Sequence, residues 1–136
     1  MGKKYFTAAE ANRWIPYLQA DIERLREIKR EYMKKALILK KMKESQQTGV
    51  AAESQFELEA SMEFLQMEAK TVADSIRMKG AELKDVDTGL VDFPAMINGE
   101  EVLLCWRMGE MQIEYFHSPQ DGFQGRKRLP EDNSES

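Results

Sequence analysis

The chain has one cysteine, Cys105, and one histidine, His117, and both stand in the stretch "LLCWRMGEMQIEYFH". A cysteine next to a histidine can act as a nucleophile, because the imidazole removes the proton of the thiol. That chemistry requires the two side chains to lie within hydrogen-bonding reach of each other. Whether they can react therefore depends on the strands that carry them.

Two turn signals predict that residues 81–117 form a small three-stranded antiparallel meander, to which "AELKDV" at its start could add a short strand. Asn98-Gly99 favours a two-residue hairpin turn, because both of its positions adopt positive φ. Gly109-Glu110 is compatible with a second tight turn, of type II′.

These two turns fix a register for the meander. Asp92 is expected opposite Cys105, and Cys105 opposite Glu114. Because side chains alternate between the faces of a sheet, Cys105 and His117 should point to opposite faces. We therefore expect no Cys–His nucleophile, and a cysteine that behaves as a small apolar side chain.

The row formed by Asp92, Cys105 and Glu114, with Arg107 one pair further along, could do other chemistry. Two carboxylates on neighbouring strands can hold a cation or serve as general acid and base. The alternative is structural: Arg107 forms ion pairs with Asp92 or Glu114 on a partly exposed face, which needs no ligand. The sequence favours the structural alternative.

A metal site could also form where the meander ends. His117 is followed by "SPQDGF", which brings Asp121 close enough in sequence to join it as a ligand. A tetrahedral zinc site needs three or four N, S or O ligands, and the spacing of the sequence shows no such set. We therefore expect no cofactor.

The composition limits the class of protein. The chain has 136 residues and a net charge of −4, so we expect one domain over residues 1–136 and no affinity for nucleic acid. No uncharged stretch approaches the roughly 18 residues of a membrane-spanning helix, and no secretory signal is recognisable. A single cysteine agrees with a reducing compartment. We expect a cytoplasmic protein that does not bind membranes.

The residues before the meander predict a long antiparallel helical hairpin, formed by residues 8–45 and 51–79. Thr7 and Glu10 form a capping-box pattern at its start, and Pro16 predicts a kink after a short first helix. Beyond the kink, apolar residues at steps of three and four keep one face of each helix apolar. The predicted fold class is therefore α+β.

The two long helices carry opposite charges, since residues 24–43 are rich in Lys and Arg whereas the second helix is rich in Glu. We expect these charges to align the helices, although each exposed pair contributes only about a few tenths of a kcal/mol. Burying a large apolar side chain contributes more, roughly 1.5–3 kcal/mol. Several such side chains lie outside the paired faces, namely Leu37, Ile38, Phe56, Phe64 and Met67. A second copy is the simplest cover, so we expect a homodimer through the helices, with a different protein partner as the alternative.

Residues 118–136 are predicted to form a C-terminal turn and a disordered tail. Asp121-Gly122 marks the turn, and Phe123 can anchor the segment on the sheet. From Pro130 onward the residues are polar and charged, a composition typical of disorder.

The stretches "FTAAEAN", "GLVDFPA", "LLCWRMGE", "YFH" and "GFQGR" resemble the motifs of a family of small uncharacterised bacterial proteins, known as a domain of unknown function. The resemblance covers almost the whole chain, with Phe116 where the family pattern has Trp. It implies a bacterial cytoplasmic protein and brings no established activity. The motif residues correspond here to Asp92, Cys105, Trp106, Arg107, Glu110, His117, Phe123 and Arg126.

Two functions of different class fit these patterns. The favoured interpretation is a non-enzymatic homodimeric protein-interaction module, because the helices are long and amphipathic and no catalytic set is evident. The alternative is a small metal-binding protein or hydrolase with a carboxylate and histidine site at the edge of the meander. Its candidate residues are Asp92, Glu114, His117, Asp121 and Arg126.

Overall fold

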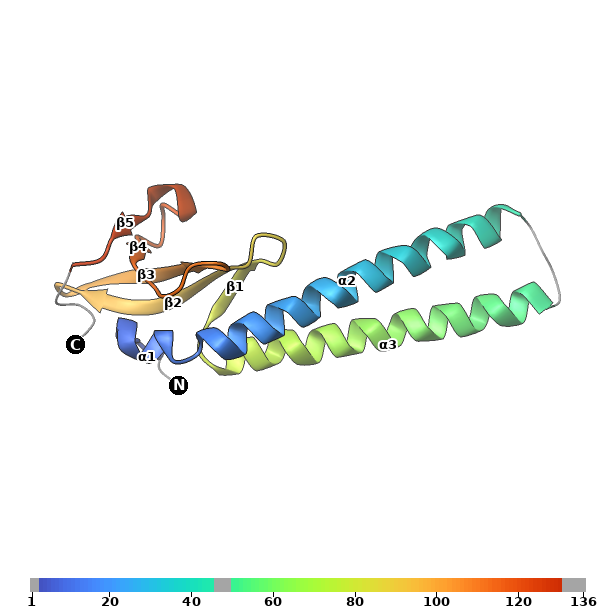
Figure 1. Cartoon of the computed structure of the whole chain (residues 1–136), viewed down its shortest axis with the longest axis horizontal. Coiled ribbons are helices and arrows are strands. Elements are labelled where there is room, and N and C mark those ends of the chain that lie inside the picture. Colours follow the sequence, from blue (N-terminus) through green and yellow to red (C-terminus); the bar gives the residue numbers. More distant parts are fainter. Residues whose placement is uncertain (1–2, 46–49, 131–136) are drawn as a thin grey trace.

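The computed structural model describes residues 3–45 and 50–130. The fold is α+β, as predicted, with a long pair of helices followed by an antiparallel sheet (Figure 1). The helices are α1 (Ala8–Asn12), α2 (Ile15–Glu44) and α3 (Val50–Met78). The strands are β1 (Glu82–Asp85), β2 (Leu90–Ile97), β3 (Glu100–Arg107), β4 (Tyr115–His117) and β5 (Lys127–Arg128), and the 3-10 helix η1 (Phe123–Gly125) precedes β5.

The beginning of α1 is capped as predicted. Thr7 Oγ1 accepts a hydrogen bond from Glu10 N at 3.1 Å, and Glu10 Oε1 accepts one from Thr7 N at 2.9 Å. The chain then bends between α1 and α2, and Pro16 lies in the first turn of α2. A proline is tolerated there because the first helical N–H groups have no partner within the helix.

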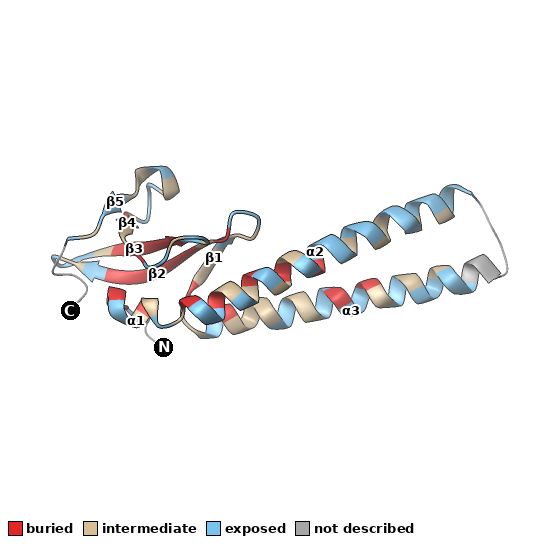
Figure 2. Cartoon of the chain, in the orientation of Figure 1, coloured by how far each residue is buried: buried red, intermediate tan, exposed pale blue. Residues whose placement is uncertain are grey.

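α2 and α3 pack as an antiparallel pair, and the residues 46–49 between them lie outside the described part of the chain. Arg24 of α2 pairs with Glu68 of α3 at 2.5 Å, and Asp21 of α2 pairs with Lys79, which directly follows α3, at 3.2 Å. Buried residues gather at the end of the hairpin next to the sheet, whereas its far half is largely exposed (Figure 2). The hairpin therefore extends well beyond the core that it helps to form.

The sheet has five antiparallel strands in the order β1-β2-β3-β4-β5, so the prediction of three strands is wrong. β1 is the short strand within "AELKDV". β5 comes from the segment predicted to be a turn and a disordered tail: it pairs with β4, and Leu129 N donates to Glu114 O at 2.8 Å. A turn at residues 119–121 precedes η1, whereas β5 was not predicted, and residues 131–136 lie outside the described residues.

One face of the sheet packs against the helices and forms the core. The core residues with no exposed surface include Val91, Phe93, Leu104 and Trp106 of the sheet and Leu18 and Ile22 of α2. In Figure 1, α1 and the first turns of α2 lie along this face, and the C-terminal segment lies on the other side. The second face of the sheet is therefore available for a site between the strands and the C-terminal segment.

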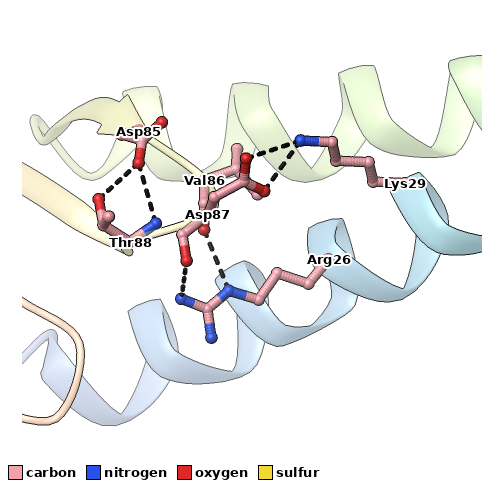
Figure 3. A network of polar contacts seen from close by, with 6 residues as sticks. All are labelled: Arg26, Lys29, Asp85, Val86, Asp87 and Thr88. Atoms are coloured by element: carbon pink, nitrogen blue, oxygen red, sulfur yellow. Dashed lines mark hydrogen bonds and ion pairs between the residues drawn. The ribbon is translucent and has the colours of Figure 1, made fainter.

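The loop between β1 and β2 is tied to α2 (Figure 3). Arg26 donates to the carbonyl oxygens of Val86 at 3.0 Å and Asp87 at 2.7 Å. Lys29 Nζ pairs with the carboxylate of Asp87 at 2.8 Å. Because β1 is an edge strand, these contacts help to fix the strand that carries Lys84 relative to the helices.

Candidate metal centre

β2 and β3 pair in the predicted register. Asn98 and Gly99, with φ of 52° and 81°, form the two-residue turn, and Asp92 stands opposite Cys105. A tight turn between two strands fixes every pair that follows it. The prediction for this hairpin is confirmed along its whole length.

β3 and β4 pair one residue away from the predicted register. Cys105 stands opposite Tyr115 rather than Glu114, and Leu103 stands opposite His117. Because the side-chain period of a strand is two residues, this shift moves every side chain of β4 to the other face. The prediction that Cys105 and His117 point to opposite faces is therefore wrong.

The cause is the loop of residues 108–114, which begins with a β-turn from Arg107 to Glu110 but does not close a two-residue hairpin at Gly109-Glu110. Glu110 folds back on β3, where its carbonyl oxygen accepts a hydrogen bond from Trp106 Nε1 at 3.0 Å. Ile113 N donates to Asn12 Oδ1 at 2.7 Å instead of to β3. These bonds use the loop residues in other contacts, so the ladder with β3 begins only with β4.

Asp92, Cys105 and His117 come together on the face of the sheet turned away from the helices. We refer to them as the Asp–Cys–His cluster. One potential ligand atom from each residue lies within 4.8 Å of the other two. Asp92 and His117 are each only 3% exposed, and Cys105 has no exposed surface. Polar groups buried to this extent need partners.

Both ring nitrogens of His117 have such partners. Nδ1 lies 2.8 Å from Ser118 O, and because a carbonyl only accepts, Nδ1 carries a hydrogen and donates it. Nε2 points at the carboxylate of Asp92, 3.2 Å from Oδ1 and 3.1 Å from Oδ2. The carbonyl of Ser118 thus directs Nε2 into the cluster, and metal-binding histidines are commonly oriented in this way.

Burial raises the pKa of both acidic groups of the cluster when no ion is bound. Burial raises the pKa of the Asp92 carboxyl, and the adjacent His117 opposes this shift. Burial also raises the pKa of the Cys105 thiol to about 12, and the charge of Asp92 adds to the effect. At neutral pH Cys105 is therefore a thiol rather than a thiolate.

This arrangement does not provide an activated cysteine. Cys105 and His117 are close, but the imidazole is engaged with Ser118 on one side and Asp92 on the other. A general base for the thiol would need a free ring nitrogen aimed at the sulfur. The cluster is better described as a set of three ligands than as a nucleophile and its base.

Three ligands of these types fit a tetrahedral metal site with one open position. Zinc lies about 2.0–2.3 Å from S, N and O ligands, so its ligand atoms stand roughly 3.3–3.8 Å apart. In the cluster, His117 Nε2 and Asp92 Oδ2 are 3.1 Å apart and all three ligand atoms lie within 4.8 Å of one another, so small side-chain shifts would bring them to these separations. Imidazole, thiolate and carboxylate are all accepted by zinc, whereas magnesium and calcium avoid sulfur. A divalent ion would also displace the thiol proton and offset the buried negative charge.

A cavity of about 250 Å³ adjoins the cluster. The three cluster residues line it together with Lys84, Leu90, Leu103, Pro119, Gly122 and Phe123. The last three belong to the segment that was predicted to be a turn and tail. The C-terminal segment therefore completes the cavity, and a fourth ligand could reach the cluster through it.

Three other candidate residues lie outside the cluster. Arg107 is exposed and, within the described residues, forms no ion pair with Asp92 or Glu114, so the structural alternative is wrong. Glu114 instead faces Arg128 at 3.8 Å. Asp121 is exposed and does not join the cluster.

Arg126 lies beside the cluster and fastens the C-terminal segment. Its Nη2 pairs with Glu110 Oε2 at 2.8 Å, and its guanidinium lies over the rings of Tyr115 and Phe123, 3.9 and 4.6 Å from their centroids. Its charge also opposes the rise in the pKa of Cys105. Arg126 thus supports the wall of the cavity through its contact with Phe123, which lines it.

Sequence reasoning missed Lys84 and Ser118. Lys84 stands in "AELKDV", and an antiparallel strand at that place would have brought it to the edge beside Asp92. Ser118 contributes its backbone carbonyl, which carries no signal in the residue type. The fold was needed to find both.

The fold and the cluster define a class of protein: a small α+β protein with a protruding helical hairpin and a buried Asp–Cys–His cluster. The chain matches the family described as Uncharacterized conserved protein (DUF2203) over residues 4–129, and it belongs to that family. No curated protein and no solved structure matches it. Within the described residues, the helices are too short or too polar to cross a membrane.

Proposed function

We propose that Asp92, Cys105 and His117 bind one transition-metal ion, and that zinc matches these ligand types best. The observation that carries the proposal is the convergence of three different ligand atoms within 4.8 Å, with the histidine oriented by a backbone carbonyl. Buried ionisable side chains are costly unless they are paired or bind a metal. The metal-binding alternative of the sequence analysis is thereby favoured, with a different set of ligands.

Three protein ligands and one open position are typical of catalytic rather than structural zinc. Such an ion, when bound, polarises a carbonyl or lowers the pKa of a coordinated water. The protein would contribute the cavity that admits a ligand and the Ser118 carbonyl that holds the imidazole in place. A hydrolytic activity is compatible with this arrangement and follows only if the metal is present.

Elemental analysis of protein purified without an affinity tag tests the proposal. We expect about one zinc per chain in the wild type and its loss in His117→Ala and Cys105→Ser. The matched control is Asp121→Asn, because Asp121 is an exposed acid near the cavity that does not join the cluster.

Cobalt substitution gives a second measurement. A thiolate bound to Co²⁺ produces a charge-transfer band in the near ultraviolet, which the Cys105→Ser variant should lack. A wild-type protein that neither retains zinc nor develops this band would overturn the proposal. Equal metal content in the wild type and His117→Ala would do the same.

A second candidate function is the homodimeric protein-interaction module. It is favoured by large apolar side chains exposed on the helices, such as Phe56, Phe64 and Met67, which are 72%, 66% and 67% exposed. The two helices also carry sets of opposite charge, a lysine set on α2 and a glutamate set on α3. Within the described residues, no ion pair involves the members of these sets. The sets are Lys34, Lys35, Lys40, Lys41 and Lys43 on α2, and Glu53, Glu57, Glu59 and Glu63 on α3. In a two-fold dimer each set can face the other on the second copy.

Sedimentation velocity at micromolar concentration tests this candidate. The wild type should sediment as a dimer, and the double variant Phe56→Ser with Phe64→Ser as a monomer. Met111→Ser is the matched control, since Met111 is 95% exposed and lies in the loop next to the sheet. A monomeric wild type would refute the homodimer and leave a different protein partner.

We also propose that the protein works in the bacterial cytoplasm. The resemblance to bacterial motifs supports this, and so does the metal site, since a cysteine ligand is kept available by a reducing compartment. Fractionation of a bacterial cell that expresses the protein would test the location.

A further inference from the structure

We propose that the cavity beside the cluster binds a small monocarboxylate, with one carboxylate oxygen on the metal and the other near Lys84. This inference rests on the proposed function, because the metal supplies the first contact. It goes further in naming the chemical class of the ligand and the residue that selects it.

The charges around the cavity favour a ligand with a single negative charge. A divalent ion bound by Asp92, Cys105 as thiolate and neutral His117 has no net charge. Among the described residues that line the cavity, Lys84 is the one cation. Glu82 stands opposite Asp92 and pairs with Lys84, but it does not line the cavity. Once Lys84 turns from Glu82 to a ligand, its single charge balances a monoanion, whereas a dianion would leave an excess negative charge.

Lys84 is able to turn toward a ligand. Its Nζ is 3.1 Å from Glu82 Oε2, but both side chains are nearly half exposed, at 49% and 43%. Exposed ion pairs of this kind contribute little, so the lysine can exchange one carboxylate partner for another. The strand that carries it is held by the contacts of the β1–β2 loop with α2 (Figure 3).

The remaining walls fit a short hydrocarbon group. They are formed mainly by Leu90, Leu103, Pro119 and Phe123. The cavity volume of about 250 Å³ corresponds to roughly eight water molecules at about 30 Å³ each. That volume lies below the usual range for drug-sized ligands, so it suits an acid of a few carbon atoms.

Titration of the cobalt-loaded full-length protein with propionate tests the inference. Propionate should change the cobalt absorption spectrum, and propionamide, which has the same shape without the charge, should bind about tenfold more weakly. Lys84→Met should weaken propionate binding by about tenfold and leave propionamide unchanged, while Lys84→Arg should retain most of the affinity. Inorganic phosphate should bind more weakly than propionate.

Several results would overturn the inference. Equal binding of propionate and propionamide, tighter binding of phosphate, or an unchanged propionate affinity in Lys84→Met would each do so. Cobalt uptake without any response to propionate overturns this inference alone. A wild-type protein that takes up no cobalt overturns the proposed function, and this inference with it.

Discussion

His117 Nε2 lies 3.1 Å from Asp92 Oδ2, and the two side chains are only 3% and 4% exposed. The pair joins the end of β4 to the middle of β2, with β3 between them. Because both side chains are buried, the Asp92 carboxyl depends on His117 Nε2 as its hydrogen-bonding partner in the metal-free protein, and Nε2 depends on Asp92. Any substitution at one of them is also a change in the surroundings of the other.

Replacing His117 by Ala should lower the free energy of unfolding of the metal-free protein by about 2–4 kcal/mol, because it leaves a buried carboxyl group without its partner. Urea denaturation in the presence of a chelator measures this loss. The double variant Asp92→Ala with His117→Ala should lose less than the sum of the two single variants. Strict additivity would show that the two residues do not stabilise each other.

Cys105 should react slowly with iodoacetamide in the native, metal-free protein at pH 8. The thiol is buried and its pKa is raised to about 12, so little thiolate is present and the reagent has poor access. Mass spectrometry of the modified protein over time measures the rate. The same protein unfolded in urea should react as fast as a free cysteine, and an equal rate in the native protein would contradict the prediction.

The sequence predicted the site residues better than their arrangement. Asp92 opposite Cys105 followed from Asn98-Gly99, whose positive φ leaves few other turns. The position of His117 could not be obtained in the same way, because the connection to β4 is set by bonds that the sequence pattern does not reveal. One of them joins Ile113 to Asn12, which is far away along the chain.

Elements that depend on neighbouring residues were predicted from the sequence, whereas β5, which depends on distant contacts, was not. The capping box at Thr7 and the apolar steps of α2 are local features, and both were read correctly from the sequence. β5 has only two residues and no apolar alternation, so its pairing with β4 depends on contacts made by Arg126 and Leu129. A strand this short has no sequence pattern that would predict it without knowledge of the rest of the sheet.

Gly89→Ala should destabilise the protein by about 2 kcal/mol or more. Gly89 has a φ of +71°, and a Cβ added there would lie 2.5 Å from Met108 Cβ. Gly99→Ala is the matched control, because Gly99 also has a positive φ, +81°, but has open space around it. The control should lose only about 1 kcal/mol from backbone strain. Thermal unfolding of both variants measures the difference, and equal losses would refute the role of the contact.

The capping box should make stability depend on pH. The hydrogen bond from Thr7 N lowers the pKa of Glu10 in the folded protein. A lowered folded pKa adds stability above the unfolded value, near pH 4.3, and this stability is lost as the pH falls through the folded pKa. Glu10→Gln should therefore be less stable than the wild type at pH 7, and the gap should close in acid. A gap that is constant between pH 7 and acid would contradict this.

Because the chain is synthesised from its N-terminus, the residues that complete the cluster and the cavity are made last. The hairpin and the first three strands are complete by Arg107, but the third member of the cluster is His117, and the cavity wall follows at Phe123. A nascent or truncated chain that ends before these residues can thus hold its helices and most of its sheet, while the pocket is still unfinished. Loss of the 20 residues from His117 onward would remove one member of the cluster together with the C-terminal wall of the cavity, although β1, β2 and β3 all precede that point.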